Sequence, residues 1–356
     1  MITSPQHRAA LPAAEDTAMR EALAAALHGP RGANPLVGAV ILDAEGRVLV
    51  TGHHRGAGTR HAEADALAQA REQGIDVTGG TIVVTLEPCN HQGRTGPCAQ
   101  AIIDAGLARV VYAIDDPHDP AAGGATTLRE AGIDVESGLH AEDATALNAR
   151  WLRGVVERRP FVTLHIAQTL DGRIAAEDGT SQWISGPQSL AHNHGIRGRI
   201  DAILVGSGTV AIDDPRLTAR TPDGELSAHQ PVRAVMGLSP VPDGAALIGT
   251  DGRFMHLVTR DPREALGLLF ESGVRHVMVE GGSRIIGAFL AAGLVDELVL
   301  YQAPTLLGSG KNSVGGLGIG TLADAQAWAW DHSDGGAVRH LGRDLLLHLQ
   351  PAAPAQ

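Results

Sequence analysis

Residues 85–98 read TLEPCNHQGRTGPC and contain both cysteines of the chain, Cys89 and Cys98. Each cysteine directly follows a proline, and each lies at or near the expected start of a helix. Upstream, residues 61–63 read HAE at the start of another expected helix. One imidazole and two thiolates are a good ligand set for Zn²⁺, so His61, Cys89 and Cys98 are candidate metal ligands.

Three protein ligands would leave a fourth position for water, which is typical of catalytic rather than structural zinc sites. Zinc lowers the pKa of such a water towards about 7 and so provides a hydroxide nucleophile. Glu63 follows His61 by two residues and is placed to take the water proton and pass it to a leaving amine. The pattern is similar to the signature of zinc deaminases, although eight residues separate the cysteines here instead of two.

Two other interpretations of these residues stay open. The cysteines could be inert small hydrophobic residues of the core. Alternatively, a purely structural zinc could recruit His91, inside the same stretch, as a fourth ligand.

The composition predicts a packed globular protein in more than one domain. The chain has 356 residues, of which 44% are hydrophobic and 19% charged. Its net charge of -12 argues against a nucleic-acid-binding protein, and no apolar run is long enough for a membrane span. We also expect no secretion signal, so two cysteines favour metal or catalytic use over a disulfide, and a cytoplasmic location.

Helices and strands are expected to alternate through two α/β regions. In the first region we expect strands at 37–42, 47–52, 81–88, 109–114 and 133–135, and helices at 18–27, 61–74, 97–106 and 126–132. In the second we expect strands at 161–167, 201–206, 232–237, 254–259, 276–282, 296–303 and 344–350, and helices at 187–198, 263–273 and 283–293. The charged stretch WLRGVVERRP interrupts the pattern, so we expect a first domain at 1–150, a linker at 151–160 and a second domain at 161–356.

The first region resembles the deaminase domain of the RibD (RibG) family of bifunctional riboflavin-biosynthesis proteins. The matching segments are NPLVGAVI (34–41), GHHRGAGTRHAEADAL (52–67), TLEPCNHQGRTGPC (85–98) and ARVVYAIDDP (108–117). The resemblance implies a cytidine-deaminase-like fold, with a mixed sheet between helices. It also implies zinc ligands His61, Cys89 and Cys98, Glu63 as proton shuttle, and substrate contacts at Asn34, His54 and Arg94.

The second region resembles the reductase domain of the same family, which has a dihydrofolate-reductase-like fold and uses NADPH. The matching segments are LDGRIA (170–175), SQWIS (181–185), DAILVGSGTVAIDDPRLTAR (201–220), VEGGSRIIGAFLAAGLVDEL (279–298) and APTLLGSG (303–310). The resemblance implies cofactor contacts at Ala167, Trp183, Thr209, Asp213, Gly282, Ser283, Arg284, Ile285, Ile286, Gly287 and Ala288. It implies substrate contacts at Ser181, Arg197, Leu217, Arg220 and Glu280.

Some of these implied contacts are also supported by the chemistry of the residues themselves. Glycines before the expected helix at 283–293 would let backbone N–H groups approach a pyrophosphate, although the stretch is not the G-x-G-x-x-G fingerprint. Arg197 and Arg220 suit a phosphate clamp. We interpret His192-Asn193-His194 as a surface segment, because residues two apart point to different sides of a helix.

The sequence departs from the family pattern most clearly at His165, where the family usually carries lysine. The segment MGLS at 236–239 differs as well. Both departures motivate an alternative, a deaminase-only or altered-substrate paralogue with an impaired reductase domain. A second alternative is a zinc-stabilised binding protein without activity.

The resemblance implies a two-step activity on small molecules. The first domain would deaminate 2,5-diamino-6-(5-phosphoribosylamino)pyrimidin-4(3H)-one with zinc. The second would reduce the ribosyl side chain of 5-amino-6-(5-phosphoribosylamino)uracil to ribityl with NADPH. The implied partners are these substrates and further copies of the chain, in a homodimer or higher homo-oligomer.

Overall fold

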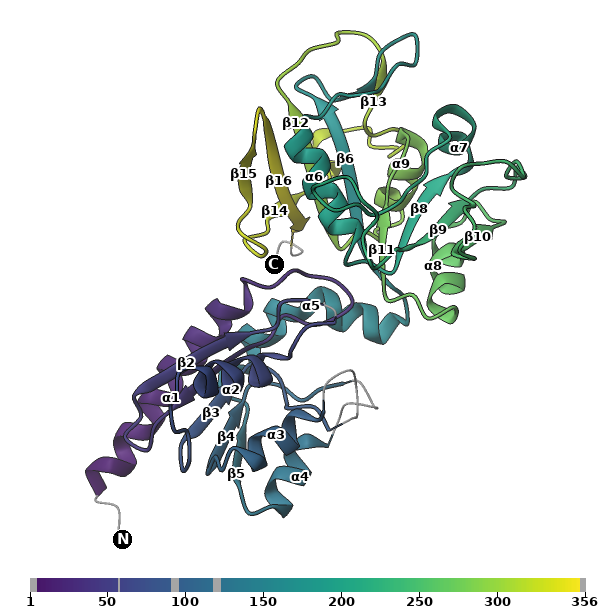
Figure 1. The fold of residues 1–356 in the computed structure, drawn as a ribbon. Coiled ribbons are helices and arrows are strands. Elements are labelled where there is room, and N and C mark those ends of the chain that lie inside the picture. Colours follow the sequence, from purple (N-terminus) through teal and green to yellow (C-terminus); the bar gives the residue numbers. More distant parts are fainter. Residues whose placement is uncertain (1–4, 57, 91–95, 118–122, 353–356) are drawn as a thin grey trace. The chain divides into compact units, whose positions relative to one another are not determined.

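The chain forms two compact units in the computed structural model, which describes residues 5–56, 58–90, 96–117 and 123–352 (Figure 1). One unit comprises residues 1–156 and 333–335, and the other comprises residues 157–332 and 336–356. No helix in the described ranges is long and apolar enough to cross a membrane.

The first unit is built on a mixed sheet with the strand order β2-β1-β3-β4-β5. Strand β1 is antiparallel to β2 and β3, whereas β3, β4 and β5 are parallel. The strands are β1 (Gly38–Leu42), β2 (Val48–His53), β3 (Thr81–Val84), β4 (Arg109–Tyr112) and β5 (Asp134–Ser137). The helices are α1 (Pro5–Ala26), α2 (Ala62–Glu72), α3 (Cys98–Asp104), α4 (Gly124–Glu130) and α5 (Ala141–Glu157).

Helices cover both faces of this sheet (Figure 1). Along β1, Ala39 and Ile41 join a core cluster with residues of α2, α3 and α4, while Val40 and Leu42 join one with residues of α1 and α5. Successive strand side chains point to opposite faces, so a strand covered on both sides is apolar throughout. The expected mixed sheet between helices is confirmed.

Helix α5 is a difference from the expected organisation. The stretch at 151–160 was expected to be a linker, but α5 runs through it as far as Glu157. Ala144 and Asn148 are buried one turn apart, and Trp151 follows on the same face. The charges of WLRGVVERRP therefore reflect the solvent side of an amphipathic helix rather than a break in the chain.

The second unit is built on a larger sheet with the strand order β10-β9-β8-β11-β6-β12-β16-β14, and β15 pairs with β16. Strands from β10 to β12 in this order are parallel, and β16 is antiparallel to β12. The strands are β6 (Phe161–Thr169), β8 (Ala202–Gly206), β9 (Val232–Met236), β10 (Phe254–Leu257), β11 (His276–Val279), β12 (Glu297–Ala303), β14 (Trp328–Trp330), β15 (Val338–Leu341) and β16 (Asp344–Pro351). A separate small sheet pairs β7 (Arg173–Ala175) with β13 (Lys311–Asn312).

Two layers of helices cover the larger sheet. Residues of α8 and α9 join one core cluster, and residues of α6 and α7 join the cluster on the other face. The helices are α6 (Pro187–Arg197), α7 (Ser207–Asp213), α8 (Pro262–Glu271), α9 (Ser283–Ala291) and a short 3₁₀ helix at Leu322–Asp324. The expected second α/β region is confirmed, and it also contains helix α7 directly after β8, which was not among the expected helices.

The strand order places one end of the larger sheet at the point where ligands bind in α/β proteins. The chain passes from β6 to β8 and returns later to insert β11 between them. The carboxyl ends of β6, β8 and β11 therefore lie side by side. Crevices at such a reversal of strand order are the usual ligand sites of open parallel sheets.

A buried ion pair fixes the start of the second sheet. The Nη1 and Nη2 atoms of Arg159 donate to the two carboxylate oxygens of Asp296 at 2.5 and 2.8 Å. Asp296 also accepts from the backbone N–H of Val162 at 2.9 Å, and its side chain is fully buried. The pair thus links the first residues of β6 to the residue preceding β12.

We expect Asp296→Asn to destabilise the second unit by about 3–5 kcal/mol, because it leaves the guanidinium of Arg159 buried without a counter-charge. Urea unfolding followed by tryptophan fluorescence measures this, since Trp183, Trp328 and Trp330 all lie in the second unit. Arg20→Ala, which removes an exposed ion pair with Asp16, is the control and should cost less than about 1 kcal/mol. Equal stabilities for Asp296→Asn and the unmodified chain would contradict this account of the pair.

Candidate functional site

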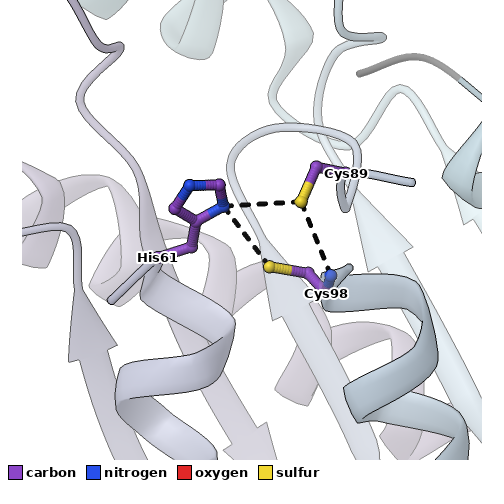
Figure 2. Close-up of side chains that lie close together, drawn as sticks. All are labelled: His61, Cys89 and Cys98. Carbon is purple, nitrogen blue, oxygen red and sulfur yellow. Dashed lines mark hydrogen bonds between the residues drawn. The ribbon is translucent and has the colours of Figure 1, made fainter. Parts of the chain in front are cut away.

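The three candidate metal ligands converge from separate places in the first unit. His61 directly precedes α2, Cys89 lies in the segment after β3, and Cys98 is the first residue of α3. Figure 2 shows the three side chains facing one another. The Nδ1 atom of His61 lies 3.5 Å from the sulfur of Cys89 and 3.4 Å from the sulfur of Cys98.

These distances fit a tetrahedral zinc ion. Bonds of about 2.3 Å to sulfur and about 2.0 Å to nitrogen place such ligand atoms about 3.5 Å apart. His61, Cys89 and Cys98 offer one nitrogen and two sulfurs, all within 4.8 Å of one another. The donor set and its spacing therefore match the preferences of zinc. His91, the possible fourth ligand, lies outside the described residues.

The pKa values of the two ligand thiols shift in opposite directions. A hydrogen bond between them lowers the pKa of Cys89 and raises the pKa of Cys98. The backbone N–H of Cys98 also points to the sulfur of Cys89, at 3.5 Å. Both cysteines are buried and form no disulfide. The site is thus prepared for one thiolate, and a cation is what would allow the second.

Glu63 lies in the first turn of α2, two residues from the metal ligand His61, and its side chain is 3% exposed. Burial raises the pKa of its carboxyl to about 7, although the charge of His61 opposes the shift. A carboxyl group with a pKa near neutrality can both accept and release a proton. Glu63 thus places a buried carboxyl group next to the candidate metal ligand His61 in the chain, and its role as a proton shuttle stays a prediction.

Asn34 and His54 form a hydrogen-bonded pair next to the ligands. The Nε2 atom of His54 lies 2.9 Å from Nδ2 of Asn34, and its Nδ1 lies 3.0 Å from the carbonyl oxygen of Arg60. Since the carbonyl can only accept, Nδ1 carries the proton and Nε2 accepts from Asn34. Burial lowers the pKa of His54, and its ring meets the His61 ring edge-on at 5.5 Å. Arg94, the third expected substrate contact, lies outside the described residues.

Glu87 is a buried residue of the TLEPC stretch that the sequence analysis did not single out. Its carboxylate accepts from the backbone N–H of Ala125 at 2.9 Å and of Asp116 at 3.3 Å. It therefore ties the segment that carries Cys89 to the start of α4. The position of this carboxylate, between a buried strand and a candidate ligand cysteine, is the feature of the sequence that could have indicated a structural role for Glu87.

The second unit concentrates charge at the carboxyl end of β11. Nε and Nη2 of Arg197, the last residue of α6, donate to the two oxygens of Glu280 at 3.0 and 2.7 Å. Burial by itself would raise the pKa of Glu280, but the charge of Arg197 and the hydrogen bonds around it lower that pKa to about 2. Glu280 is therefore ionised at neutral pH, and Arg197 faces a carboxylate.

Asn193 joins this pair, contrary to the expectation that residues 192–194 form a surface segment. Its Nδ2 donates to Glu280 at 3.3 Å, and its buried Oδ1 has no hydrogen-bond partner in the described part of the chain. His192 is also engaged, with Nδ1 2.6 Å from the hydroxyl of Tyr301. The surface interpretation was wrong because α6 packs against the sheet along this side.

The turn between β11 and α9 provides a close backbone approach. Gly281 has φ +127°, and a Cβ atom there would lie 2.8 Å from the hydroxyl oxygen of Thr209. Only glycine fits at this position, and Thr209 of α7 lines the same turn. The turn, with the glycine at its strand end and a helix start behind it, fits an anionic part of a cofactor.

The rest of the expected cofactor stretch divides between this turn and the core. Gly282, Ser283 and Arg284 remain at least partly exposed at the start of α9. Ile285 and Ile286 are buried in the core cluster. Gly287 packs against Gly315, whose carbonyl oxygen would lie 1.7 Å from an added Cβ. Ala288, which follows Gly287, is partly buried.

The remaining expected contacts of the second unit vary in exposure. Trp183 is 68% exposed and Leu217 is buried with φ +52°. Arg220 is partly buried, and its Nη1 donates to the carbonyl oxygen of Gly224 at 2.6 Å. The others are Ala167 on β6 and Ser181, both partly buried, and Asp213, exposed at the end of α7.

His165 lies on β6, on the sheet face that α6 covers. Its ring centroid is 5.1 Å from that of Tyr301 on β12. Burial lowers the pKa of His165, although the negative charge of Glu280 opposes the shift. The imidazole is thus neutral at pH 7, unlike the lysine expected from the family pattern.

Comparisons with known proteins assign both units. Residues 12–114 match the cytidine and deoxycytidylate deaminase zinc-binding region, and residues 160–333 match the RibD C-terminal domain. The riboflavin biosynthesis protein RibD of Mycobacterium tuberculosis (strain H37Rv) is 43% identical over 88% of this chain and 90% of its own length. The protein of the same name from Escherichia coli K12 is 37% identical over 89% of this chain and 93% of its own.

Two solved structures agree with these matches over nearly the whole chain. RibD of Acinetobacter baumannii has a TM-score of 0.73 and 31% identity, covering 96% of this chain and 99% of that one. A diaminohydroxyphosphoribosylaminopyrimidine deaminase/5-amino-6-(5-phosphoribosylamino)uracil reductase from Thermotoga maritima has a TM-score of 0.68 and 29% identity, with the same coverage.

The ligand geometry predicts about one zinc ion per chain, bound through His61 and both cysteines. We expect His61→Ala or Cys98→Ala to bring the zinc content of the purified protein close to zero, as measured by atomic emission. Glu63→Gln should keep the metal, because the carboxylate is not one of the three ligands. His53→Ala removes a neighbouring imidazole and serves as the control. Full zinc content in Cys98→Ala would contradict the assigned ligand set.

Proposed function

This chain belongs to the RibD family of riboflavin-biosynthesis proteins, with a deaminase unit followed by a reductase unit, and from that premise we propose a role for each residue of its two sites. The observation that carries the proposal is the convergence of His61, Cys89 and Cys98 beside the buried carboxyl of Glu63. The deaminase-only alternative has no support, because both units match their counterparts in the family.

The first unit deaminates a diaminopyrimidinone that carries a phosphoribosylamino group. A water oxygen replaces the exocyclic amino group on the ring, the C–N bond breaks, and ammonia leaves. His61, Cys89 and Cys98 would hold a zinc ion, which when bound would supply Lewis-acid activation of the attacking water. Glu63 takes one proton of that water and passes it to a ring nitrogen, and it then carries the second proton to the leaving amine.

Asn34 and His54 orient the pyrimidine in the first site. The hydrogen bonds of His54 fix its tautomer, so the Asn34 amide is held by one N–H and offers its oxygen and second N–H to the polar edge of the ring. Arg94 is proposed, from the resemblance alone, to hold the phosphate.

The second unit reduces the ribosyl side chain of the deaminated product to ribityl. A nicotinamide cofactor, when bound, supplies the hydride that reduces C1 of the ring-opened sugar. The residues that would hold it are the turn at Gly281–Arg284 with Thr209, together with Ala167, Trp183 and Asp213. We propose NADPH as the form used.

Glu280 and Arg197 hold the sugar phosphate at the carboxyl end of the sheet. The ionised carboxylate of Glu280 can accept hydrogen bonds from sugar hydroxyls. Arg197 uses only some of its N–H groups on Glu280 and Thr218, so others remain for a phosphate, with Arg220 as second donor. Ser181 and Leu217 complete the proposed substrate contacts. His165 lies near this charge pair and can donate one hydrogen bond while neutral.

The cellular setting and assembly are proposed on separate grounds. Both cysteines must stay reduced to bind metal, which favours the cytoplasm. A homodimer or higher homo-oligomer stays a prediction from the family resemblance. The partners are the small-molecule substrates.

A mass-resolved product assay tests both activities on the zinc-loaded protein. Without NADPH we expect only deaminated product from the diaminopyrimidinone substrate, and with NADPH a product that is also reduced. Glu63→Gln should keep zinc and lower the deamination rate by about 10²–10⁴-fold, because the proton shuttle is lost. Undiminished deamination in this variant would rule out the role of Glu63. Deamination without any reduction would implicate His165, with His165→Lys as the next variant.

The reductase site is tested directly with the deaminated compound and NADPH. We expect Glu280→Gln to lower kcat/KM for reduction by about 10–100-fold, since a hydrogen bond to a charged group contributes about 1.5–3 kcal/mol. Deamination by the same chain should not change, which controls for the amount of protein assayed. Glu225→Gln, an exposed glutamate of the same unit, should reduce at the normal rate. A normal reduction rate in Glu280→Gln would exclude Glu280 from the site.

A further inference from the structure

Helix α5 is hydrogen-bonded to the segment that carries Asn34. The Oδ1 atom of Asn148 accepts from the backbone N–H of Leu36 at 2.8 Å, and its Nδ2 donates to the carbonyl oxygen of Leu36 at 2.9 Å. Asn148 is 1% exposed, and the two residues are 112 positions apart in the chain. One side-chain amide thus satisfies both backbone groups of a single residue, as a strand partner would.

Two more hydrogen bonds, one donated from each side, connect the same helix and the same segment. The indole N–H of Trp151 donates to the carbonyl oxygen of Ala33 at 3.2 Å, and Nη1 of Arg31 donates to the carbonyl oxygen of Leu147 at 2.7 Å. Contacts from α5 therefore flank Asn34 on both sides. The segment at 31–36 belongs to no helix or strand, so no regular backbone ladder holds it.

We propose that α5 contributes to the deaminase site through Asn148, a positioning residue. Asn148 would hold Asn34 in the place where its amide hydrogen-bonds to His54. The inference rests on the proposed function, in which Asn34 contacts the pyrimidine. Asn148 touches neither substrate nor metal, and it acts by fixing the backbone two residues beyond Asn34. Displacements of about 1 Å in a substrate-positioning group can lower a rate by about 10²-fold.

The form of the contact favours positioning over simple stabilisation. Ala144 already packs α5 against the sheet through apolar contact in the core cluster on that face. A buried amide is costly unless it is hydrogen-bonded. Here both polar atoms of the Asn148 side chain bond to one irregular segment, the one that presents a proposed substrate contact.

The first test is Asn148→Leu, which keeps the γ-branched shape of the side chain with somewhat more volume and leaves both backbone groups of Leu36 unpaired. We expect kcat/KM for deamination to fall at least about tenfold, which corresponds to about 1.4 kcal/mol. Zinc content and reduction of the deaminated compound by the same chain should be unchanged. Val156→Ala is the matched control, because Val156 lies on α5 and is 79% exposed. Normal deamination by folded Asn148→Leu would overturn the proposal.

A double-mutant cycle shows whether Asn148 acts through Asn34. In an Asn34→Ala background we expect Asn148→Leu to change kcat/KM by less than about twofold, because the group it positions is already gone. An effect as large as in the unmodified chain would overturn the proposal and leave Asn148 a general stabilising residue.

A milder variant decides the matter if Asn148→Leu does not fold. Trp151→Phe removes the indole N–H together with part of the ring, leaves Asn148 in place, and should lower deamination by about two- to tenfold, about the value of one neutral hydrogen bond. A folded Trp151→Phe with normal deamination would then count against the proposal. Failure of the unmodified chain to deaminate would overturn the proposed function itself, whereas an active chain with unaffected variants overturns only the role of α5.

Discussion

The first unit depends on bringing one imidazole nitrogen and two sulfur atoms to within about 3.5 Å of one another. No single stretch of backbone can do this, because the three atoms come from the start of α2, the segment after β3 and the start of α3. The sheet brings the three atoms together, because β1 and β3 lie side by side and α2 and α3 pack on the same face above them. The fold therefore supplies a buried donor set that suits a metal cation.

The second unit places its charge by a different principle. Glu280 and Arg197 neutralise each other at the carboxyl end of the sheet, and Asn193 supports the carboxylate. The pair is preformed, so little reorganisation is needed when a sugar phosphate arrives. The turn at Gly281 lies next to Glu280 in the chain, which puts the proposed cofactor and substrate contacts on adjacent residues of one strand end. Both units thus build a site where elements end rather than within them.

Much of this organisation could be predicted from local sequence. The spacing of His61, Glu63, Cys89 and Cys98 is visible in the chain, and alternating apolar runs located most strands and helices. Helix α5 was missed for a local reason, because its charged residues hid the period of its buried face. The other failures share a physical cause, since they depend on contacts between distant residues. Asn193, Glu87 and Asn148 were missed because each looks like a surface residue until its partner, up to 112 positions away, is known. The pairing of Arg197 with Glu280 has the same origin, as neither residue signals the other.

The hydrogen bonds between α5 and the segment around Asn34 also affect how the deaminase unit can be separated from the reductase unit. A fragment ending at residue 150, where the sequence suggests a boundary, would lack Trp151 and the last two turns of α5. Its candidate metal ligands would all be present, yet the segment before β1 would lose the hydrogen bond from Trp151 to Ala33. A fragment meant to carry the first unit should therefore extend through Glu157, the last residue of α5.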